Sequence, residues 1–484
     1  MARIIVIGGG ITGLAAAHRL RLDSPQHDVT LVEAGERCGG HVHTVHEDGF
    51  LVEAGPNAFM ARADEPEPLA LVRELGLESG LIEAERASRR RYVWLRGRLR
   101  TAPSSPLSLL TTDTLSLAGK LRLAAEPFVP RGGDAGESVH TFATRRLGLE
   151  AAEALVDPAI SGITAGDSRE LEAAAAFPAL AGMEHEHGSL LRALLARGAR
   201  PPRLVTLAPG MGVLADMLCW QLEGRIRLNT RVLRIARAGG GWRVLLDSGE
   251  SLQADAVIVA TSAADAAAPL APLDPELAYV LSRFPQSGLA VVAMGFRAED
   301  VPRPLNGYGF LTARGEGMGT LGAVWESSLF AGRAPEGHVL VRAMLGGARR
   351  PDSMQLEEPA LVERARCDLA AVMGICAPPV RHWVWRWPRA ITQYTGGHRE
   401  RVARARVCAS RQPGLELCGT SYDGVSFTAA IVSAERAVAR LLGSLTLAPR
   451  RPGAPPARPA APAFHGAAPH LSLVRSDRCV DMSS

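Results

Sequence analysis

Six residues near the start of the chain have the spacing of a dinucleotide-binding turn. Gly8, Gly9, Gly10, Ile11, Thr12 and Gly13 satisfy the pattern GxGxxG, between a strand pattern over 3–7 and a helix pattern over 14–22. Here the first glycine permits a tight bend, the second lets the backbone approach a pyrophosphate, and the third allows close packing of helix on sheet. Glu33, about 20 residues further on, ends a second strand pattern over 29–32 and is placed to bind ribose hydroxyls. The motif predicts a nucleotide cofactor with a free 2′-hydroxyl, which disfavours NADP and leaves NAD and FAD open.

The residues after this acid separate FAD from NAD. The run 33–40 (EAGERCGG) resembles the ExxxRxGG extension of the amine oxidase and phytoene desaturase superfamily, whose members bind FAD. The run 53–58 (EAGPNA) resembles the next glycine turn of that superfamily, which approaches the flavin. The resemblance implies an FAD-dependent oxidoreductase. Besides the first turn, it assigns to the cofactor Glu33, Ala34, Arg37, Gly39, Gly40, Gly55, Pro56, Asn57 and Ala58.

An ordered set of further segments resembles the oxygen-dependent protoporphyrinogen oxidases, from residue 3 to the region of residue 442. No single segment is diagnostic, but the ordered set is. It comprises 53–59 (EAGPNAF), 91–103 (RYVWLRGRLRTAP), 161–171 (SGITAGDSREL), 306–311 (NGYGFL), 344–349 (MLGGAR), and 386–394 (RWPRAITQY) with His398. The resemblance implies an oxygen-consuming, six-electron oxidation of protoporphyrinogen IX to protoporphyrin IX in haem biosynthesis. Coproporphyrinogen III, oxidised to coproporphyrin III, stays open as the substrate.

The same resemblance assigns a small set of residues to the substrate. Arg91 begins the RYV segment, where a guanidinium would bind a propionate through a bidentate, permanently charged contact. Tyr308, Leu311 and Met344 are implied to sandwich the macrocycle. Gly162 is the candidate catalytic residue, because a side chain there would intrude between flavin and substrate. From the residues alone, Arg91 also fits a solvated arginine run, Gly162 a turn glycine, and the other three plain core.

A last group of residues is implied to contact the flavin or the adenine. It comprises Val232, Trp387, Gly419, Val425, Ser426 and Phe427, and each of these also fits ordinary packing. Where the family has a glycine followed by Asn-Asp-Cys-Ile at the flavin-facing helix start, this chain reads GVSFTAAI over 424–431. A helix N-terminus there would still favour negative charge on the reduced ring. The altered segment puts the reoxidation rate and the substrate choice in question.

The implied mechanism is three hydride transfers from the porphyrinogen to the flavin, with reoxidation by oxygen to hydrogen peroxide. The protein would supply a slot for the macrocycle and charge pairing to orient it; no general base is identified, and His398 fits a structural role. Lys120 is the only lysine and lies far from the region where amine oxidases carry theirs. An amine oxidase or desaturase reaction, and a non-catalytic flavin or porphyrin-binding protein, are the alternatives.

The elements that must position these residues come from separated parts of the chain. The predicted fold class is α/β, with a discontinuous Rossmann-type FAD-binding domain over 1–85, 204–265 and 386–444. The later segments of this domain are indicated by strand patterns at 226–235, 242–246, 256–260 and 415–420 and by a helix pattern at 429–442. A helical insertion is expected over 86–203, and a mixed α+β substrate-binding domain over 266–385. The segment 445–484, with seven prolines between 449 and 469, is expected to be a disordered tail.

Composition excludes several classes of protein. The formal net charge is +4, and most of that excess lies in the tail, so no nucleic-acid partner is expected. Seven scattered cysteines without a CxxC spacing disfavour a disulfide framework and a metal site. We expect no secretory signal and no membrane span, and therefore a cytoplasmic protein. Contact of 103–130 with a membrane surface stays open, beside packing against its own core, and so does a homodimer.

Overall fold

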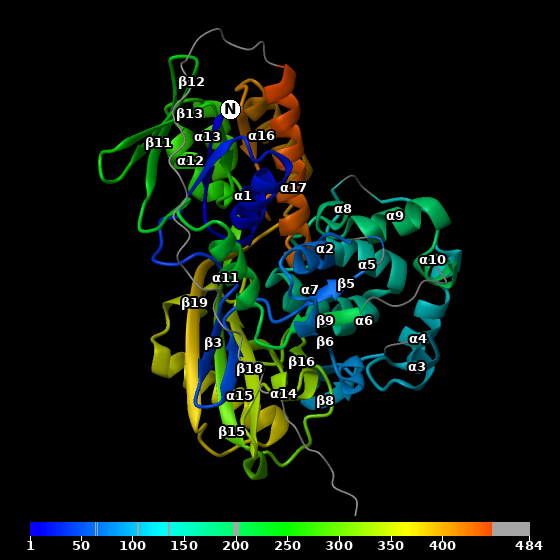
Figure 1. Ribbon diagram of the computed structural model, residues 1–484. Helices are drawn as coiled ribbons and strands as arrows, with labels where there is room; N and C mark the ends of the chain where they lie inside the picture. The colour runs from blue at the N-terminus through cyan, green and yellow to red at the C-terminus, as the bar shows by residue number, and fades with distance from the viewer. Residues whose placement is uncertain (63, 65, 104–105, 134–135, 197–202, 448–484) are drawn as a thin grey trace, which may run out of the picture. The chain divides into compact units, whose positions relative to one another are not determined.

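The structure is a computed structural model that describes residues 1–62, 64, 66–103, 106–133, 136–196 and 203–447 (Figure 1). The expected disordered tail over 445–484 lies outside the described residues, except for 445–447, which end the last helix, α17 (Phe427–Leu447).

A five-stranded parallel sheet carries the glycine turn at the carboxyl end of its central strand. Its order is β10-β2-β1-β14-β20, with neighbours paired in parallel. The strands are β1 (Arg3–Ile7), β2 (Asp28–Val32), β10 (Ile226–Arg227), β14 (Ala256–Val259) and β20 (Leu415–Leu417). The sheet therefore gathers strands from distant parts of the chain, and the expected α/β fold class is confirmed.

Alternating side chains of β1 build the cores on the two faces of this sheet. Ile4 and Val6 belong to a core shared with α1 (Ile11–Asp23), α11 (Gly212–Gln221) and α17. Ile5 and Ile7 belong to the opposite core, formed with α12 (Ala263–Leu270), α13 (Pro275–Ser282), α16 (His398–Ser410) and a small sheet of β11 (Val232–Ala238), β12 (Gly241–Leu246) and β13 (Ser251–Ala254). Burial on both faces explains the continuous apolar strand RIIVI.

A seven-stranded sheet of order β19-β15-β18-β17-β16-β7-β8 forms the second layer. Its strands are β7 (Tyr92–Leu95), β8 (Arg98–Thr101), β15 (Gln286–Arg297), β16 (Gly309–Thr312), β17 (Thr320–Val324), β18 (His338–Gly346) and β19 (Arg381–Thr392). All neighbours are antiparallel except β16 and β7. Helix α15 (Glu358–Met373) packs on this sheet. The domain boundary expected at residue 386 falls inside β19.

Two segments differ from the sequence-based expectation. Residues 92–101, expected within the helical insertion, form the hairpin β7–β8, because Arg96 and Gly97 both take positive φ (55° and 65°), the geometry of a tight two-residue turn. The strand expected over 226–235 is broken at Asn229, whose φ is 48°, so β10 and β11 join different sheets. Asparagine tolerates this left-handed conformation.

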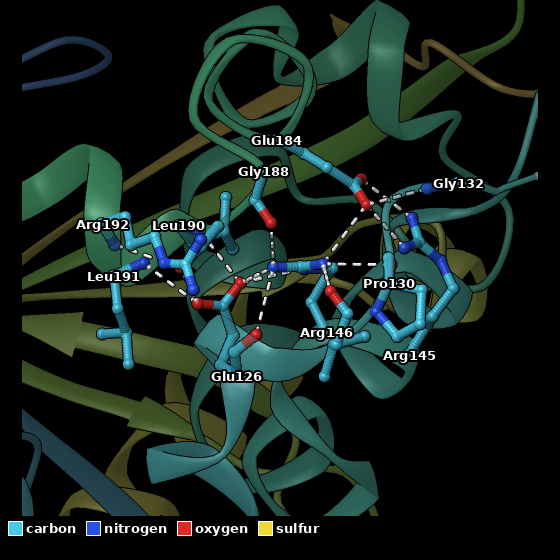
Figure 2. A network of polar contacts seen from close by, with 12 residues as sticks. Glu126, Pro130, Gly132, Arg145, Arg146, Glu184, Gly188, Leu190, Leu191 and Arg192 are labelled. Atoms are coloured by element: carbon cyan, nitrogen blue, oxygen red, sulfur yellow. Dashed lines mark hydrogen bonds and ion pairs between the residues drawn. The ribbon is translucent and has the colours of Figure 1, made fainter.

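Buried charges hold the rest of the insertion together (Figure 2). It contains α4 (Leu117–Ala124), η3 (Glu126–Phe128), α5 (Val139–Leu147), α7 (Asp157–Thr164), α9 (Pro178–His187) and α10 (Leu190–Ala196). Glu126 and Arg146, both fully buried, form an ion pair, and the same carboxylate accepts hydrogen bonds from the Leu190 and Leu191 amides at 2.9 and 3.1 Å. These contacts join η3, α5 and α10.

Candidate functional site

The glycine turn 8–13 has the shape of an anion cradle. Gly8 has a φ of 105°, and a Cβ on Gly13 would lie 1.9 Å from the carbonyl oxygen of Gly8, so helix α1 can approach the strand only because residue 13 is glycine. A Cβ on Gly10, the N-terminal cap of α1, would meet no atom within 4 Å. Open space at a helix N-terminus, with free amides and a positive dipole, fits a pyrophosphate.

Hydrogen bonds hold the extension 33–40 next to the glycine turn. The Glu33 carboxylate accepts from the amides of Gly9 and Gly35, at 2.6 and 2.7 Å. The Gly39 amide donates to the Gly9 carbonyl at 2.8 Å, while Arg37 donates to the Gly40 carbonyl at 2.8 Å. Two amides thus orient the acid that the sequence assigns to the ribose.

Neighbouring segments complete this end of the site. The backbone amide of Thr230 donates to the Glu33 carbonyl at 2.9 Å, which brings the start of β11, with the buried Val232, beside the extension that also holds Ala34. Gly419 follows β20, and a Cβ on it would lie 3.9 Å from Cγ2 of Thr12. The structure therefore brings Gly419 to the glycine turn and the start of β11 to the extension 33–40.

Two side chains of the seven-stranded sheet and one from α14 (Glu326–Leu329) hold the second predicted turn, 53–58, in place. The Trp387 indole donates to the Ala54 carbonyl at 2.8 Å, and Arg342 donates to the carbonyls of Glu53 and Gly55. Glu326 accepts from the Asn57 amide at 3.0 Å and pairs with Arg342 at 2.9 Å. A Cβ on Gly55 would lie 2.0 Å from the His41 carbonyl oxygen. The turn, which also includes Pro56 and Ala58, is therefore tightly constrained. The sequence reasoning missed Glu326 and Arg342.

The altered segment at 424–431 still begins a helix. The Ser426 hydroxyl accepts from the Ala429 amide at 3.0 Å and so caps α17, and Phe427 stacks on Phe59 with ring centroids 5.5 Å apart. Val425 packs against the core of the helical insertion. The chain therefore keeps a capped N-terminus where the family motif differs.

Tyr394 and His398 stabilise the segment that leads into α17. The Tyr394 hydroxyl accepts from the Gly424 amide at 2.6 Å and donates to the Thr420 carbonyl at 2.8 Å, while His398 stacks on its ring at 3.6 Å. Burial, reinforced by Arg401, lowers the pKa of His398 to about 3, so the imidazole is neutral. A buried neutral ring that supports a loop matches a structural role better than that of a base.

The residues assigned to the substrate meet on one face of the seven-stranded sheet. Leu311 and Met344 both pair in register with Gly322 of the strand between them, so their side chains flank a position without a side chain. A Cβ on Gly162, in α7, would lie 2.3 Å from Cδ2 of Leu311. Tyr308 and Met344 pack against the same small cluster as Ala58 of the flavin-approaching turn. We call Gly162, Tyr308, Leu311 and Met344 the substrate face.

Arg91 lies beside this face. Its guanidinium carbon is 5.4 Å from the centroid of the Tyr308 ring, and its side chain is exposed. Burial, with the nearby Glu326 carboxylate, raises the pKa of Tyr308, so the phenol stays protonated beside the cation. The arrangement presents a permanent positive charge next to an apolar surface, which can pair with a carboxylate on a flat apolar ligand.

The comparisons with known proteins agree with this geometry. The family described as flavin containing amine oxidoreductase matches residues 11–442. The chain belongs to this family. It is 31% identical over 466 residues to coproporphyrinogen III oxidase of Bacillus subtilis (strain 168), covering 91% of this chain and 97% of the relative. It is 32% identical over 478 residues to protoporphyrinogen oxidase of Bos taurus, covering 91% and 98%. A solved structure from Exiguobacterium sp. 255-15, provisionally named a protoporphyrinogen oxidase, aligns with a TM-score of 0.80 at 27% identity, over 92% of this chain and 99% of the other.

As a flavin containing amine oxidoreductase, the chain is an FAD-dependent enzyme. The expected superfamily and cofactor are confirmed, while the roles of the single residues stay predictions. The site fits the cofactor: the space at Gly10 suits the pyrophosphate, the oriented carboxylate of Glu33 suits the ribose, and the turn 53–58 leads from the first turn towards the substrate face.

A buried charge cluster, also missed by the sequence reasoning, fixes α7 of this flavin containing amine oxidoreductase. Asp157, the first residue of the helix, pairs with Arg314 at 3.1 Å and Arg349 at 3.3 Å, and Arg314 also pairs with Asp167 at 2.6 Å. A five-residue π-helix, Ala152–Val156, precedes it, and such insertions are frequent at functional sites. These contacts hold Gly162 against the sheet.

Proposed function

We propose that this enzyme oxidises protoporphyrinogen IX to protoporphyrin IX in haem biosynthesis, removing six electrons with oxygen as the final acceptor. The observation that carries the proposal is the juxtaposition of the Arg91 cation with Tyr308, at 5.4 Å, beside the apolar residues of the substrate face. A porphyrinogen has the matching chemistry: a broad apolar macrocycle with propionates on one edge. The names of the relatives support the same substrate class.

Each residue has a definite task in this proposal. Arg91 pairs with a propionate, and a hydrogen bond between charged groups contributes about 1.5–3 kcal/mol. Leu311 and Met344 support the macrocycle, and Gly162 leaves the space that a side chain would fill. FAD, when bound, supplies the hydride acceptor. Three rounds convert one protoporphyrinogen and three O₂ into one protoporphyrin and three H₂O₂, so that the electrons balance.

Coproporphyrinogen III is the second candidate, and the Bacillus subtilis relative favours it. This substrate carries propionates where protoporphyrinogen carries vinyl groups, so discrimination depends on extra charge pairing at the edge of the macrocycle. Arg96 and Arg98 follow Arg91 in the sequence, but they lie at the turn of the hairpin β7–β8 and the start of β8, and Arg96 pairs with Glu150 at 3.3 Å.

Anaerobic reduction of the FAD-loaded protein tests the proposal. We expect protoporphyrinogen to bleach the flavin absorbance, and admission of oxygen to restore it with release of porphyrin fluorescence and peroxide. Faster bleaching by coproporphyrinogen would make that compound the substrate. No bleaching by either would refute the proposal and favour an amine oxidase or desaturase reaction, or a binding protein.

We further propose that the insertion contacts a membrane surface. No helix in the described part of the chain is long and apolar enough to cross a bilayer. Leu117, Leu121 and Phe128, on α4 and η3, are 74%, 64% and 82% exposed, so the face that could have packed on its own core instead meets solvent. Leu117 and Leu121 are four residues apart and share one helix face, as in helices that lie in a bilayer interface.

A further inference from the structure

A cavity of about 450 Å³ between the helical insertion and α16 has no task in the proposed reaction. Residues of α5, of α9, of the start of α8 (Ala173–Ala176) and of the first turn of α16 line it. None of these described lining residues is assigned to FAD or belongs to the substrate face. The volume lies in the range of sites that hold small organic molecules. The cavity is therefore a second place where this chain offers space for a ligand.

One buried carboxylate lines this cavity without a hydrogen-bond partner. Glu172 is only 4% exposed, and its Oε2 atom accepts no hydrogen bond from the described residues. It precedes α8, yet its side chain does not cap that helix. The guanidinium of Arg401, on the neighbouring α16, is already engaged by the Thr395 and Gly396 carbonyls at 3.0 and 2.9 Å. Because a carboxylate buried without a donor is costly, the arrangement favours a cation in the cavity.

The two other acids of low exposure in the cavity wall already have partners. Arg145 pairs with Glu137 and with Glu184, in both cases at 2.7 Å, and Figure 2 shows its guanidinium directed at Glu184. Glu184 also pairs with Arg146 at 3.5 Å. Of the three acids in this described part of the wall, Glu172 is thus the one whose charge is left for a ligand.

The outer edge of the cavity has an excess of positive charge. Arg131 and Arg399 line it, are exposed, and form no ion pair with a carboxylate in the described part of the chain. The exposed acid Glu400 offsets one of these two charges. Phe142 and Ala173, both buried, add apolar surface to the wall. The cavity therefore combines a buried negative charge, apolar walls and a net positive charge at its mouth.

We propose that this cavity binds a small zwitterionic amino acid, with the ammonium group at Glu172 and the carboxylate group at Arg131 and Arg399. An ammonium group supplies the donors that the Glu172 carboxylate lacks. A guanidinium group can only donate hydrogen bonds, which suits a carboxylate at the mouth. The apolar walls contact the chain between the two ends. An amine without a carboxylate satisfies only the buried half of the site.

Calorimetric titration of the FAD-loaded full-length protein with ε-aminocaproate tests the proposal. Hexylammonium and hexanoate, which each carry one of its two charged ends, are titrated in parallel. We expect ε-aminocaproate to bind more tightly than hexylammonium, and hexanoate to give no binding heat. Glu172→Gln should weaken binding of ε-aminocaproate and of hexylammonium about tenfold or more, through loss of one charged hydrogen bond. Glu170→Gln, which changes an exposed acid outside the lining, should bind both as the wild type does.

Two further variants separate the parts of the site. Arg399→Gln should weaken binding of ε-aminocaproate severalfold and leave that of hexylammonium unchanged, because only the first ligand has a carboxylate. Ala181→Phe fills the cavity from α9 at a half-buried position and should abolish binding of both ligands. Flavin absorbance and thermal melting show whether each variant has folded and retained FAD.

Three results would overturn the proposal. The first is the absence of binding heat with ε-aminocaproate at millimolar concentrations. The second is binding that persists in both Glu172→Gln and Ala181→Phe, which would place the ligand elsewhere, for example at the flavin. The third is equal affinity for hexylammonium and ε-aminocaproate, which would exclude recognition of the carboxylate. No porphyrinogen is present in these titrations, so their outcome is independent of the proposed oxidase reaction.

Discussion

Replacing Gly162 with alanine adds one methyl group where α7 faces the seven-stranded sheet. The added Cβ would lie 2.3 Å from Cδ2 of Leu311, whereas apolar contacts are made at about 4 Å. The tip of the leucine must therefore shift by about 1 Å or more. Because Leu311 is half-buried and flexible at its end, it can move, and the direction left to it is across the substrate face.

The expected effect separates stability from activity. Alanine is more favourable than glycine inside a helix by about 0.8–1 kcal/mol, and overpacking costs about 1–3 kcal/mol, so the free energy of unfolding should fall by about 2 kcal/mol at most. The gain in helix propensity does not offset a misalignment of the substrate. Since a misplacement of about 1 Å can cost about a hundredfold in rate, we expect kcat/KM to fall between tenfold and a hundredfold.

Porphyrin fluorescence under steady-state turnover measures this loss, with flavin absorbance and thermal melting as controls for FAD content and folding. The matched variant is Leu311→Ala, alone and combined with Gly162→Ala. If the methyl group acts by displacing the leucine, the double variant should be more active than the product of the two single losses predicts. Additive losses, or an unchanged kcat/KM for Gly162→Ala, would refute the reasoning.

Four further predictions test the other parts of the molecule. Arg91→Ala should raise KM for porphyrinogen about tenfold or more, by loss of one charged contact; an unchanged KM would rule out its proposed role. Glu33→Gln leaves one backbone amide facing another donor, so the dissociation constant of FAD, measured by flavin fluorescence, should rise about tenfold or more, and normal FAD retention would contradict this. Burial would raise the pKa of Asp167, but its arginine partner outweighs burial and lowers it, so its carboxylate stabilises the fold above the unfolded pKa and loses that effect as the pH falls. Asp167→Asn should therefore lower the melting temperature near pH 7, and the difference from the wild type should shrink as the pH falls below the ordinary aspartate pKa of 3.8; a pH-independent difference would argue against it. Leu121→Asp should weaken co-sedimentation with anionic vesicles while Val407→Asp, on α16, does not; equal binding of both variants would exclude the proposed membrane face.

The parts of the fold that the sequence predicted are those that local chemistry determines. The glycine turn requires glycine at two positions, because Gly13 packs closely against the preceding backbone and Gly10 leaves space for a pyrophosphate. Both requirements are visible in the sequence as the GxGxxG motif. The order of the family segments placed Tyr308, Leu311 and Met344 in one set, and the structure brings them to one sheet. Their roles towards the substrate stay predictions.

The parts that the sequence did not predict depend on partners far apart in the chain. Glu326 reaches Asn57 across 269 positions, and no spacing rule connects them. Asp157 pairs with Arg314 and Arg349, which follow the strands β16 and β18, so its surroundings exist only after the sheet has formed. The hairpin at 92–101 depends on a positive φ at Arg96, and arginine is not one of the residue types that indicate such a turn.

The network of Glu126 couples two helices whose sequences are far apart. The Leu190 amide, at the start of α10, donates to a carboxylate that lies 64 positions earlier in the chain. Hydrogen exchange at Leu190 and Leu191 therefore reports the detachment of η3 as well as fraying of their own helix. Because η3 ends at the exposed Phe128, binding of this surface to a membrane should stabilise η3. Slower exchange of the two amides in the presence of vesicles would therefore report membrane contact of the insertion.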